Sequence, residues 1–138
     1  MKSMIISSKN KRIDYISRCR IGKMHDYRFL KEEFPPDTAW FEHFNVKVDL
    51  GYSGIAKDYI CQYIGIPHKK QRNGELTEQQ KAENKLWASE RITVEHSLAG
   101  LKRYRVLSDR LRLHTLNLYD KIIGLCAGLW NFYLFDFS

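Results

Sequence analysis

The sequence has few cysteines, and they are widely spaced. Cys19, Cys61 and Cys126 are the only three in 138 residues, and no CxxC pair occurs. An odd number at wide spacing excludes a disulfide scaffold and a cysteine-type zinc site, and it fits a reducing compartment. We expect three buried, unreactive thiols, because free cysteine usually packs as a small apolar residue.

The sequence also lacks a long hydrophobic run. Near the N-terminus only residues 4–6 are apolar before charges follow, which excludes a signal peptide. The most apolar stretch, residues 122–135, covers about 14 residues, whereas a membrane span needs about 20. We therefore expect a soluble, intracellular protein with no membrane partner and a buried C-terminal helix.

The composition is that of a folded, basic protein. Hydrophobic residues make up 43% and aromatic residues 13%, which excludes a disordered polar tail. A chain of 138 residues predicts a single domain with its own core. Lysine and arginine number 23 against 16 acidic residues, a net charge of +7, which favours an anionic partner such as nucleic acid.

Local patterns predict strands first and helices later. Strands are expected at residues 2–6, 12–17, 17–21, 44–50 and 63–67, with a turn at 7–11. Helices are expected at residues 25–33, 53–63, 77–107 with at most one break, and 113–135. Pro35 and Pro36 end the first helix, and Thr77 with Gln80 forms a capping box for the third. This order predicts a mixed α/β sandwich with a helical C-terminal half.

One aspartate stands at the end of a predicted strand. Asp49 follows the alternating segment FNVKV and precedes a turn at Gly51. Active sites of α/β sheets gather at this edge, and hard divalent cations bind carboxylate oxygens. Asp49 is therefore a candidate metal ligand, and capping of the turn is the alternative.

A second carboxylate lies on the predicted helix RITVEHSLAGLK. On a helix, Glu95 and Lys102 fall about 40° and 20° from Arg91, so the three form one stripe. Apolar residues predicted to be buried flank this stripe: Val94, Leu98 and Leu101. A carboxylate between two cations can meet a metal ion and phosphates. The alternative is a surface ion pair between Arg91 and Glu95.

A basic segment, IPHKK at residues 66–70, follows another predicted strand and is extended by Gln71 and Arg72. Its cations form either a patch that contacts phosphates or a solvated loop.

Together these segments resemble transposases of the DDE superfamily, most closely insertion-sequence transposases of the IS-five kind, which are related to the harbinger-type endonuclease domain. The matching segments, in the family's order, are GKMHDYRFLK (22–31), VDLGYSGI (48–55), IPHKK (66–70), ELTEQQKAENK (75–85), RITVEHSLAGLKRYRVLSDR (91–110) and GLCAGLWNF (124–132). They cover nearly the whole chain. The spacing R-x3-E-x6-K matches the signature around the family's third carboxylate, although Ala88 replaces the usual tyrosine.

The resemblance implies an RNase H-like mixed sheet flanked by helices, in one domain over residues 1–138. It also implies three carboxylates, Asp, Asp and Glu, that hold two Mg²⁺ or Mn²⁺ ions. Asp49 would be the second catalytic carboxylate and Glu95 the third, so we expect them to converge at one sheet edge. Arg91 would support the helix of Glu95, and Lys102 would contact DNA. Further DNA contacts are expected from His68, Lys69, Lys70, Arg103 and Arg105.

The sequence departs from the family at the first carboxylate. Ser7 and Ser8 stand where the family has an Asp after its first strand, and a neutral hydroxyl is a poor Mg²⁺ ligand. Asp26 is expected at a loop or helix start, and Asp14 on the neighbouring strand would have to move to substitute. The helical DNA-binding segment that usually precedes this strand is also missing. We therefore expect a truncated transposase, inactive alone.

Two alternatives to a transposase domain remain. One is a non-catalytic DNA-binding or regulatory fragment derived from a transposase, and the other is a helical interaction protein whose basic charge is incidental. The expected partners are DNA and either a second copy or a complementing transposase chain. The expected location is the bacterial cytoplasm, at the nucleoid.

Overall fold

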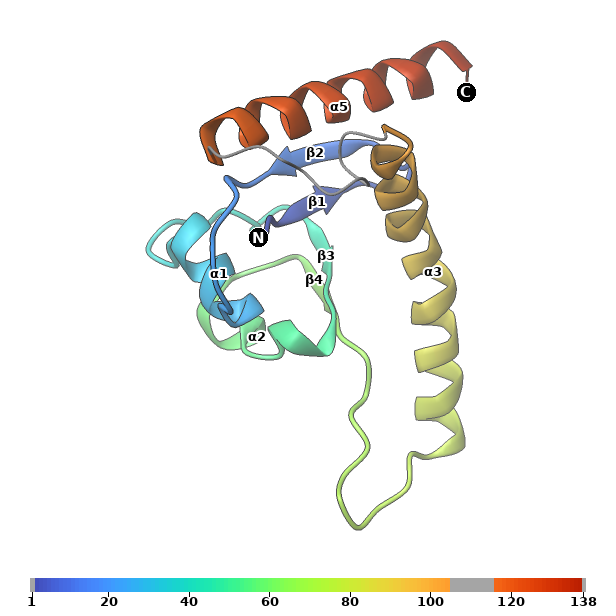
Figure 1. The fold of residues 1–138 in the computed structure, drawn as a ribbon. Helices are drawn as coiled ribbons and strands as arrows, with labels where there is room; N and C mark the ends of the chain where they lie inside the picture. The colour runs from blue at the N-terminus through green and yellow to red at the C-terminus, as the bar shows by residue number, and fades with distance from the viewer. Residues whose placement is uncertain (1, 105–115, 138) are drawn as a thin grey trace. The chain divides into compact units, whose positions relative to one another are not determined.

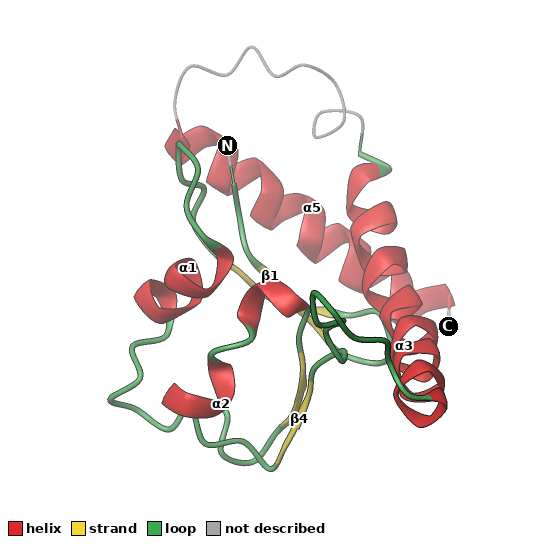
Figure 2. Ribbon diagram, turned by 90° about the horizontal axis from the view of Figure 1, so that it is seen from below, coloured by secondary structure: helices red, strands yellow, loops and turns green. Residues whose placement is uncertain are grey.

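The computed structural model describes residues 2–104 and 116–137. These residues form a mixed α/β structure with two small sheets and four α-helices, and helices dominate (Figures 1 and 2). The chain divides into two compact units. We call residues 1–22 with 91–138 the hairpin unit and residues 23–90 the parallel-strand unit. The mixed α/β class is confirmed, whereas the RNase H-like arrangement stays a prediction.

The hairpin unit begins with two antiparallel strands, as the sequence predicts. β1 (Ile5–Ser7) pairs with β2 (Ile13–Ile16), and the register shifts once where β2 carries one extra residue. Lys11 closes the turn with a φ of 69°. A bridge between Lys2 and Arg20 extends the ladder, so the expected third strand at 17–21 is reduced to this single bridge.

Two helices supply the rest of this unit. α3 (Glu78–Lys102) reaches it with its C-terminal half, and α5 (Leu116–Phe137) lies along the hairpin (Figure 1). The core consists of Ile13, Leu101, Ile123, Cys126, Ala127 and Trp130. Both Ser97 Oγ and the Trp130 indole N–H donate to the Lys11 carbonyl, at 2.7 and 3.0 Å, so the core also fixes the hairpin turn.

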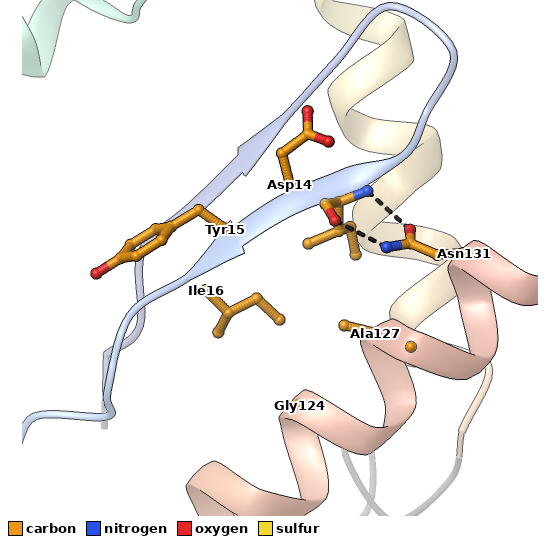
Figure 3. A pocket seen from close by; sticks show the side chains of 8 residues that line it. Asp14, Tyr15, Ile16, Gly124, Ala127 and Asn131 are labelled. Carbon is orange, nitrogen blue, oxygen red and sulfur yellow. Dashed lines mark hydrogen bonds between the residues drawn. The ribbon is translucent and has the colours of Figure 1, made fainter. Parts of the chain in front are cut away.

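An asparagine on α5 binds the backbone of β2 as a neighbouring strand would (Figure 3). Asn131 Oδ1 accepts the Ile13 N–H at 2.9 Å, and Asn131 Nδ2 donates to the Ile13 carbonyl at 2.8 Å. Beside this clamp a hollow of about 260 Å³ lies between β2 and the small residues of α5, among them Gly124 and Gly128.

The expectation of a buried C-terminal helix is only half right. α5 forms, but its outer face exposes Leu118, Leu125, Leu129, Phe132 and Phe135. Within the described residues of the hairpin unit, the hairpin and the end of α3 pack against the opposite side of the helix. In the described part of the chain, no helix combines the length and apolar character needed to cross a membrane.

The parallel-strand unit contains β3 (Asn45–Lys47) and β4 (Tyr63–Gly65), which pair in parallel register. Around them lie α1 (Asp26–Glu33), the 3₁₀ turn η1 (Leu50–Tyr52) and α2 (Ile55–Asp58). Its most buried apolar residues are Phe29, Leu30, Ile55 and Tyr59. The predicted helix at 25–33 is confirmed, and the His25 side chain caps it by accepting the Tyr27 N–H.

Three predicted elements of this unit are shorter in the structure, and the strand expected at 63–67 ends at Gly65. The strand expected at 44–50 ends at Lys47, because Asp49 caps η1 and the chain leaves the sheet there. The helix expected at 53–63 is a single turn, because Tyr59 is extended and its hydroxyl donates to the Phe34 carbonyl at the end of α1.

The long helix α3 begins with the predicted capping box. Thr77 Oγ1 accepts the Gln80 N–H at 3.2 Å, and Gln80 Oε1 accepts the Thr77 N–H at 3.0 Å. The helix continues without a break to Lys102. The predicted helical residues 105–107 and 113–115 lie outside the described residues.

The three thiols are free, and Cys19 and Cys126 are buried while Cys61 is partly buried. Burial raises the pKa of Cys61 and of Cys126, which keeps both thiols protonated at neutral pH and therefore weakly nucleophilic. The expectation of three buried thiols holds for two of them.

Candidate functional site

Asp49 is the first residue beyond the parallel strand pair. The Val48 N–H still donates to the Gly65 carbonyl of β4, at 3.0 Å, and the chain then turns into η1. Asp49 is exposed, and its Oδ1 accepts the Leu50 N–H at 2.8 Å. The capping role considered from the sequence is therefore observed, and it fixes the direction of the carboxylate.

The basic loop starts at the same edge as Asp49. Lys47 pairs with Gly65, and the two strands are parallel, so the residues that follow them leave from one edge. Asp49 follows β3, and the segment from Ile66 to Lys70 follows β4. The structure thus brings together two of the features that the sequence singled out.

The histidine of this loop ties it to α3. The His68 N–H donates to Asn84 Oδ1 at 2.7 Å, and Asn84 Nδ2 donates to the His68 carbonyl at 3.1 Å. The His68 ring contacts the Glu83 carboxylate, and this hydrogen bond lowers the pKa of Glu83. His68 therefore anchors the loop, while Lys69 and Lys70 remain exposed.

Beyond the anchor, the loop forms an open, basic hollow lined by Lys69, Lys70, Gln71 and Arg72. The three cations border one side of an open space of about 570 Å³, large enough to receive a phosphate group.

Two glycines of the segment VDLGYSG let α1 approach η1 closely. A Cβ at Gly51 would lie 3.0 Å from Asp26 Oδ2, and one at Gly54 would lie 2.6 Å from the Tyr27 ring. The Tyr27 hydroxyl donates to the Gly54 carbonyl at 2.9 Å and also contacts Asp58. Asp26 is the first residue of α1, as expected. The sequence did not reveal that the HDY segment supports the Asp49 turn. In the sequence, Gly51 and Gly54 were the only sign of this close approach.

Glu95 lies on the exposed side of α3 and pairs with Arg91, with Arg91 Nε 3.7 Å from Glu95 Oε1. The predicted buried face is wrong in part: Leu101 is buried, but Val94 is 39% exposed. Small residues face the core instead, because a Cβ at Gly100 would lie only 2.5 Å from Trp130. Glu95 is consequently further from the buried face than the apolar residues suggested.

The remaining predicted DNA contacts differ in their surroundings. Lys102 is exposed near the end of α3. The Arg103 guanidinium lies 4.7 Å from the centre of the Tyr133 ring, so it also serves packing within the hairpin unit. Arg105 lies outside the described residues.

Ser7 ends β1, and its hydroxyl is buried without a hydrogen-bond partner in the described structure. Ser8 donates its hydroxyl to Asn10 in the hairpin turn, at 2.6 Å. Asp14 lies on β2 with Arg12 Nε 3.5 Å away.

Asp49 belongs to the parallel-strand unit and Glu95 to the hairpin unit. Their convergence stays a prediction.

Among the described residues, no group of three or more His, Cys, Asp or Glu side chains is placed to hold a metal ion. Mg²⁺, however, commonly uses only one or two carboxylates, with water and substrate phosphates completing its shell. The exposed carboxylate of Asp49 is a donor of this chemistry, and Asp26 places a second carboxylate beside the same turn. The metal role of Asp49 stays a prediction.

The comparisons with known proteins agree on a family. The sequence matches the family model described as DDE superfamily endonuclease over residues 1–131. It is 32% identical over 113 residues to a probable transposase for insertion sequence element IS702 of Microchaete diplosiphon. That match covers 82% of this chain and 39% of the relative. No solved structure matches significantly. The chain belongs to the DDE superfamily endonuclease family.

Proposed function

We propose that the chain supplies part of the DNA-cleaving and DNA-joining centre of a transposase, with Asp49 and Glu95 as two of its three carboxylates. The observation that carries this proposal is the family match over residues 1–131, which includes both motifs. The structure adds that Asp49 is held by its cap at the edge of the parallel strands. An RNase H-like sheet over the single domain 1–138 is part of the proposal.

The metal ions would be held by Asp49 and Glu95. When bound, a pair of Mg²⁺ or Mn²⁺ ions activates the attacking oxygen and stabilises the leaving oxygen of an in-line phosphodiester displacement. The protein's own task is to hold the carboxylates and the phosphates. Arg91 restrains Glu95 through their ion pair. Lys69 and Lys70 bind the DNA backbone from the edge that carries Asp49, and they supply charge rather than sequence recognition.

Further phosphate contacts are proposed for Lys102, Arg103, Arg105 and His68. The His68 ring now interacts with the Glu83 carboxylate. To contact DNA, the ring must exchange this carboxylate for a phosphate oxygen. The proposed partners are DNA and a second copy or complementing transposase chain, in the bacterial cytoplasm.

A second function follows from the resemblance, which implies that Ser7 and Ser8 stand where the family has its first Asp. Without that carboxylate, the chain alone would nick DNA poorly and would act as a non-catalytic DNA-binding or regulatory fragment. Both functions require DNA binding, but only the first requires that a divalent ion strengthen it at Asp49 and Glu95.

The test is a DNA-binding titration of the whole chain by fluorescence anisotropy, with and without Mn²⁺, together with a nicking assay. We expect Mn²⁺ to tighten binding about tenfold, and Asp49→Ala or Glu95→Ala to remove this gain. Asp37→Ala and Glu78→Ala remove exposed carboxylates elsewhere and should keep it.

Three other results are informative. Salt-dependent binding without an Mn²⁺ effect would support the non-catalytic function. No DNA binding at moderate salt would contradict both functions and leave the interaction protein. Nicking by the chain alone, lost in Asp49→Ala, would show that Ser7 and Ser8 do not prevent catalysis.

A further inference from the structure

A second carboxylate lies beside the turn that carries Asp49. Asp26 begins α1, and its Oδ2 is 3.0 Å from the position that a Cβ on Gly51 would occupy. Asp49 caps the same turn from its start, through the Leu50 N–H. Both residues belong to the parallel-strand unit, so their proximity is a property of one compact unit.

The approach of Asp26 depends on the missing side chain of Gly51. A Cβ 3.0 Å from a carboxylate oxygen is closer than ordinary van der Waals contact. Any other residue at position 51 would therefore make the Asp26 carboxylate give way by a few tenths of an ångström. The glycine in the motif DLGY thus leaves room for Asp26 beside the turn that Asp49 caps.

The two carboxylates share one turn. Asp49 caps η1 at its start through the Leu50 N–H, and Asp26 Oδ2 lies beside Gly51 in the middle of the same turn. A divalent cation held at Asp49 is therefore attracted by the charge of Asp26 as well.

We propose that Asp26 is a positioning residue of the Asp49 site, where its carboxylate increases the affinity of Asp49 for a divalent cation. This inference rests on the proposed function, because it presupposes that Asp49 binds the ion. Asp26 acts through charge and through its contact with η1, and the loss of either should weaken binding of the cation while the fold persists.

The test is calorimetric titration of the whole chain with Mn²⁺ alone, without DNA, supported by Mn²⁺ broadening of the Gly51 amide signal in NMR spectra. Asp26→Asn removes the charge but keeps the shape, and we expect its dissociation constant for Mn²⁺ to rise about ten- to hundredfold. Asp26→Glu keeps the charge and should lose less. Asp37→Asn, an exposed carboxylate on the loop after α1, is the matched control and should bind as the wild type does.

Gly51→Ala provides a second variant that leaves all charges in place. It should weaken Mn²⁺ binding in the wild type by displacing Asp26, but should change little in an Asp26→Ala background, where no carboxylate remains to be displaced. Unchanged thermal unfolding of Asp26→Asn shows that the affinity loss is not a folding defect.

The outcomes separate the two proposals. If Asp49→Asn abolishes Mn²⁺ binding and Asp26→Asn binds like the wild type, the role of Asp26 is refuted and the proposed function stands. If Asp49→Asn itself binds Mn²⁺ like the wild type, the metal role of Asp49 fails, and with it the proposed function.

Discussion

At the scale of single residues, Gly100 has the most crowded surroundings of the glycines. A Cβ there would lie 2.5 Å from atoms of the Trp130 ring. Gly100→Ala gains helix propensity but overpacks the core, and we expect a net loss of about 1–3 kcal/mol in the free energy of unfolding. Urea denaturation measures it. Gly124→Ala is the matched control, because nothing lies within 4 Å of its Cβ position and it should stabilise by up to about 1 kcal/mol. Equal effects of the two variants would contradict the packing explanation.

A second prediction at this scale concerns Tyr52. Its pKa is raised first by burial and then by the charges of Asp26 and Asp49. Asp26→Asn removes one of these charges, so the pKa of Tyr52 should fall toward its ordinary value. A pH titration of ¹³C-labelled tyrosine by NMR measures the pKa of each phenol, and Asp37→Asn should leave Tyr52 unchanged. An unaltered Tyr52 in Asp26→Asn would show that the two side chains do not interact.

The candidate site could be predicted only in part from its residues. Asp49 was found because it stands between a strand pattern and a glycine, both of which are local signals. Asp26 was passed over as a helix start, since its contact with Gly51 joins residues 25 positions apart in the sequence. The burial of Ser97 and Gly100 was missed for the same reason: hydrophobicity favours Val94, whereas the ring of Trp130 selects small neighbours.

At the scale of elements, the start of α3 depends on its capping box. Thr77→Ala removes the acceptor of the Gln80 N–H, and we expect a loss of about 0.5–2 kcal/mol. Gln80→Ala removes only the reciprocal bond and should cost less. Urea denaturation of both variants gives the comparison. A larger effect of Gln80→Ala would mean that Gln80 has a further role.

The clamp between α5 and β2 gives another element-scale prediction. Asn131→Ala leaves the Ile13 N–H and carbonyl without their partner, which should cost about 1–3 kcal/mol. Hydrogen exchange of the Ile13 amide should accelerate in the same variant. Asn117→Ala, at an exposed position of the same helix, should change neither the free energy of unfolding nor the exchange of the Ile13 amide. Unchanged exchange at Ile13 would contradict the clamp.

Elements whose signals are local agree best with the sequence. The hairpin, α1 and the start of α3 were predicted because turns, prolines and capping residues lie within a few positions of each other. Strand 44–50 and helix 53–63 were predicted too long, since their ends are set by the Asp49 cap and by the Tyr59 hydroxyl at the end of α1. Convergence of Asp49 and Glu95 depends on contacts between residues that are further apart in the sequence. The spacing of the motifs does not determine these contacts.

At the scale of the whole molecule, the hydrogen-bonded phenols of Tyr27 and Tyr59 make stability depend on alkaline pH. Burial and then the charge of Asp58 raise the pKa of Tyr59 from 10.0 to about 12, and burial with the hydrogen bond to Asp58 raises that of Tyr27. Below pH 10 both the folded and the unfolded chains keep these protons, so stability is at its full value. Between pH 10 and 12 the unfolded chain ionises first, and the free energy of unfolding should fall by up to about 3 kcal/mol for Tyr59.

Urea denaturation between pH 9 and pH 12 tests this dependence. Tyr59→Phe cannot ionise at this position, so its stability should fall less steeply with pH than that of the wild type, although it starts lower without the hydrogen bond to the Phe34 carbonyl. Tyr63→Phe, on an exposed ring, should keep the wild-type slope. Lysines also lose their charge in this range in every variant, so the difference in slope isolates Tyr59. Parallel slopes for Tyr59→Phe and the wild type would mean that the phenol keeps its ordinary pKa, because a group that titrates equally in both states adds no pH dependence.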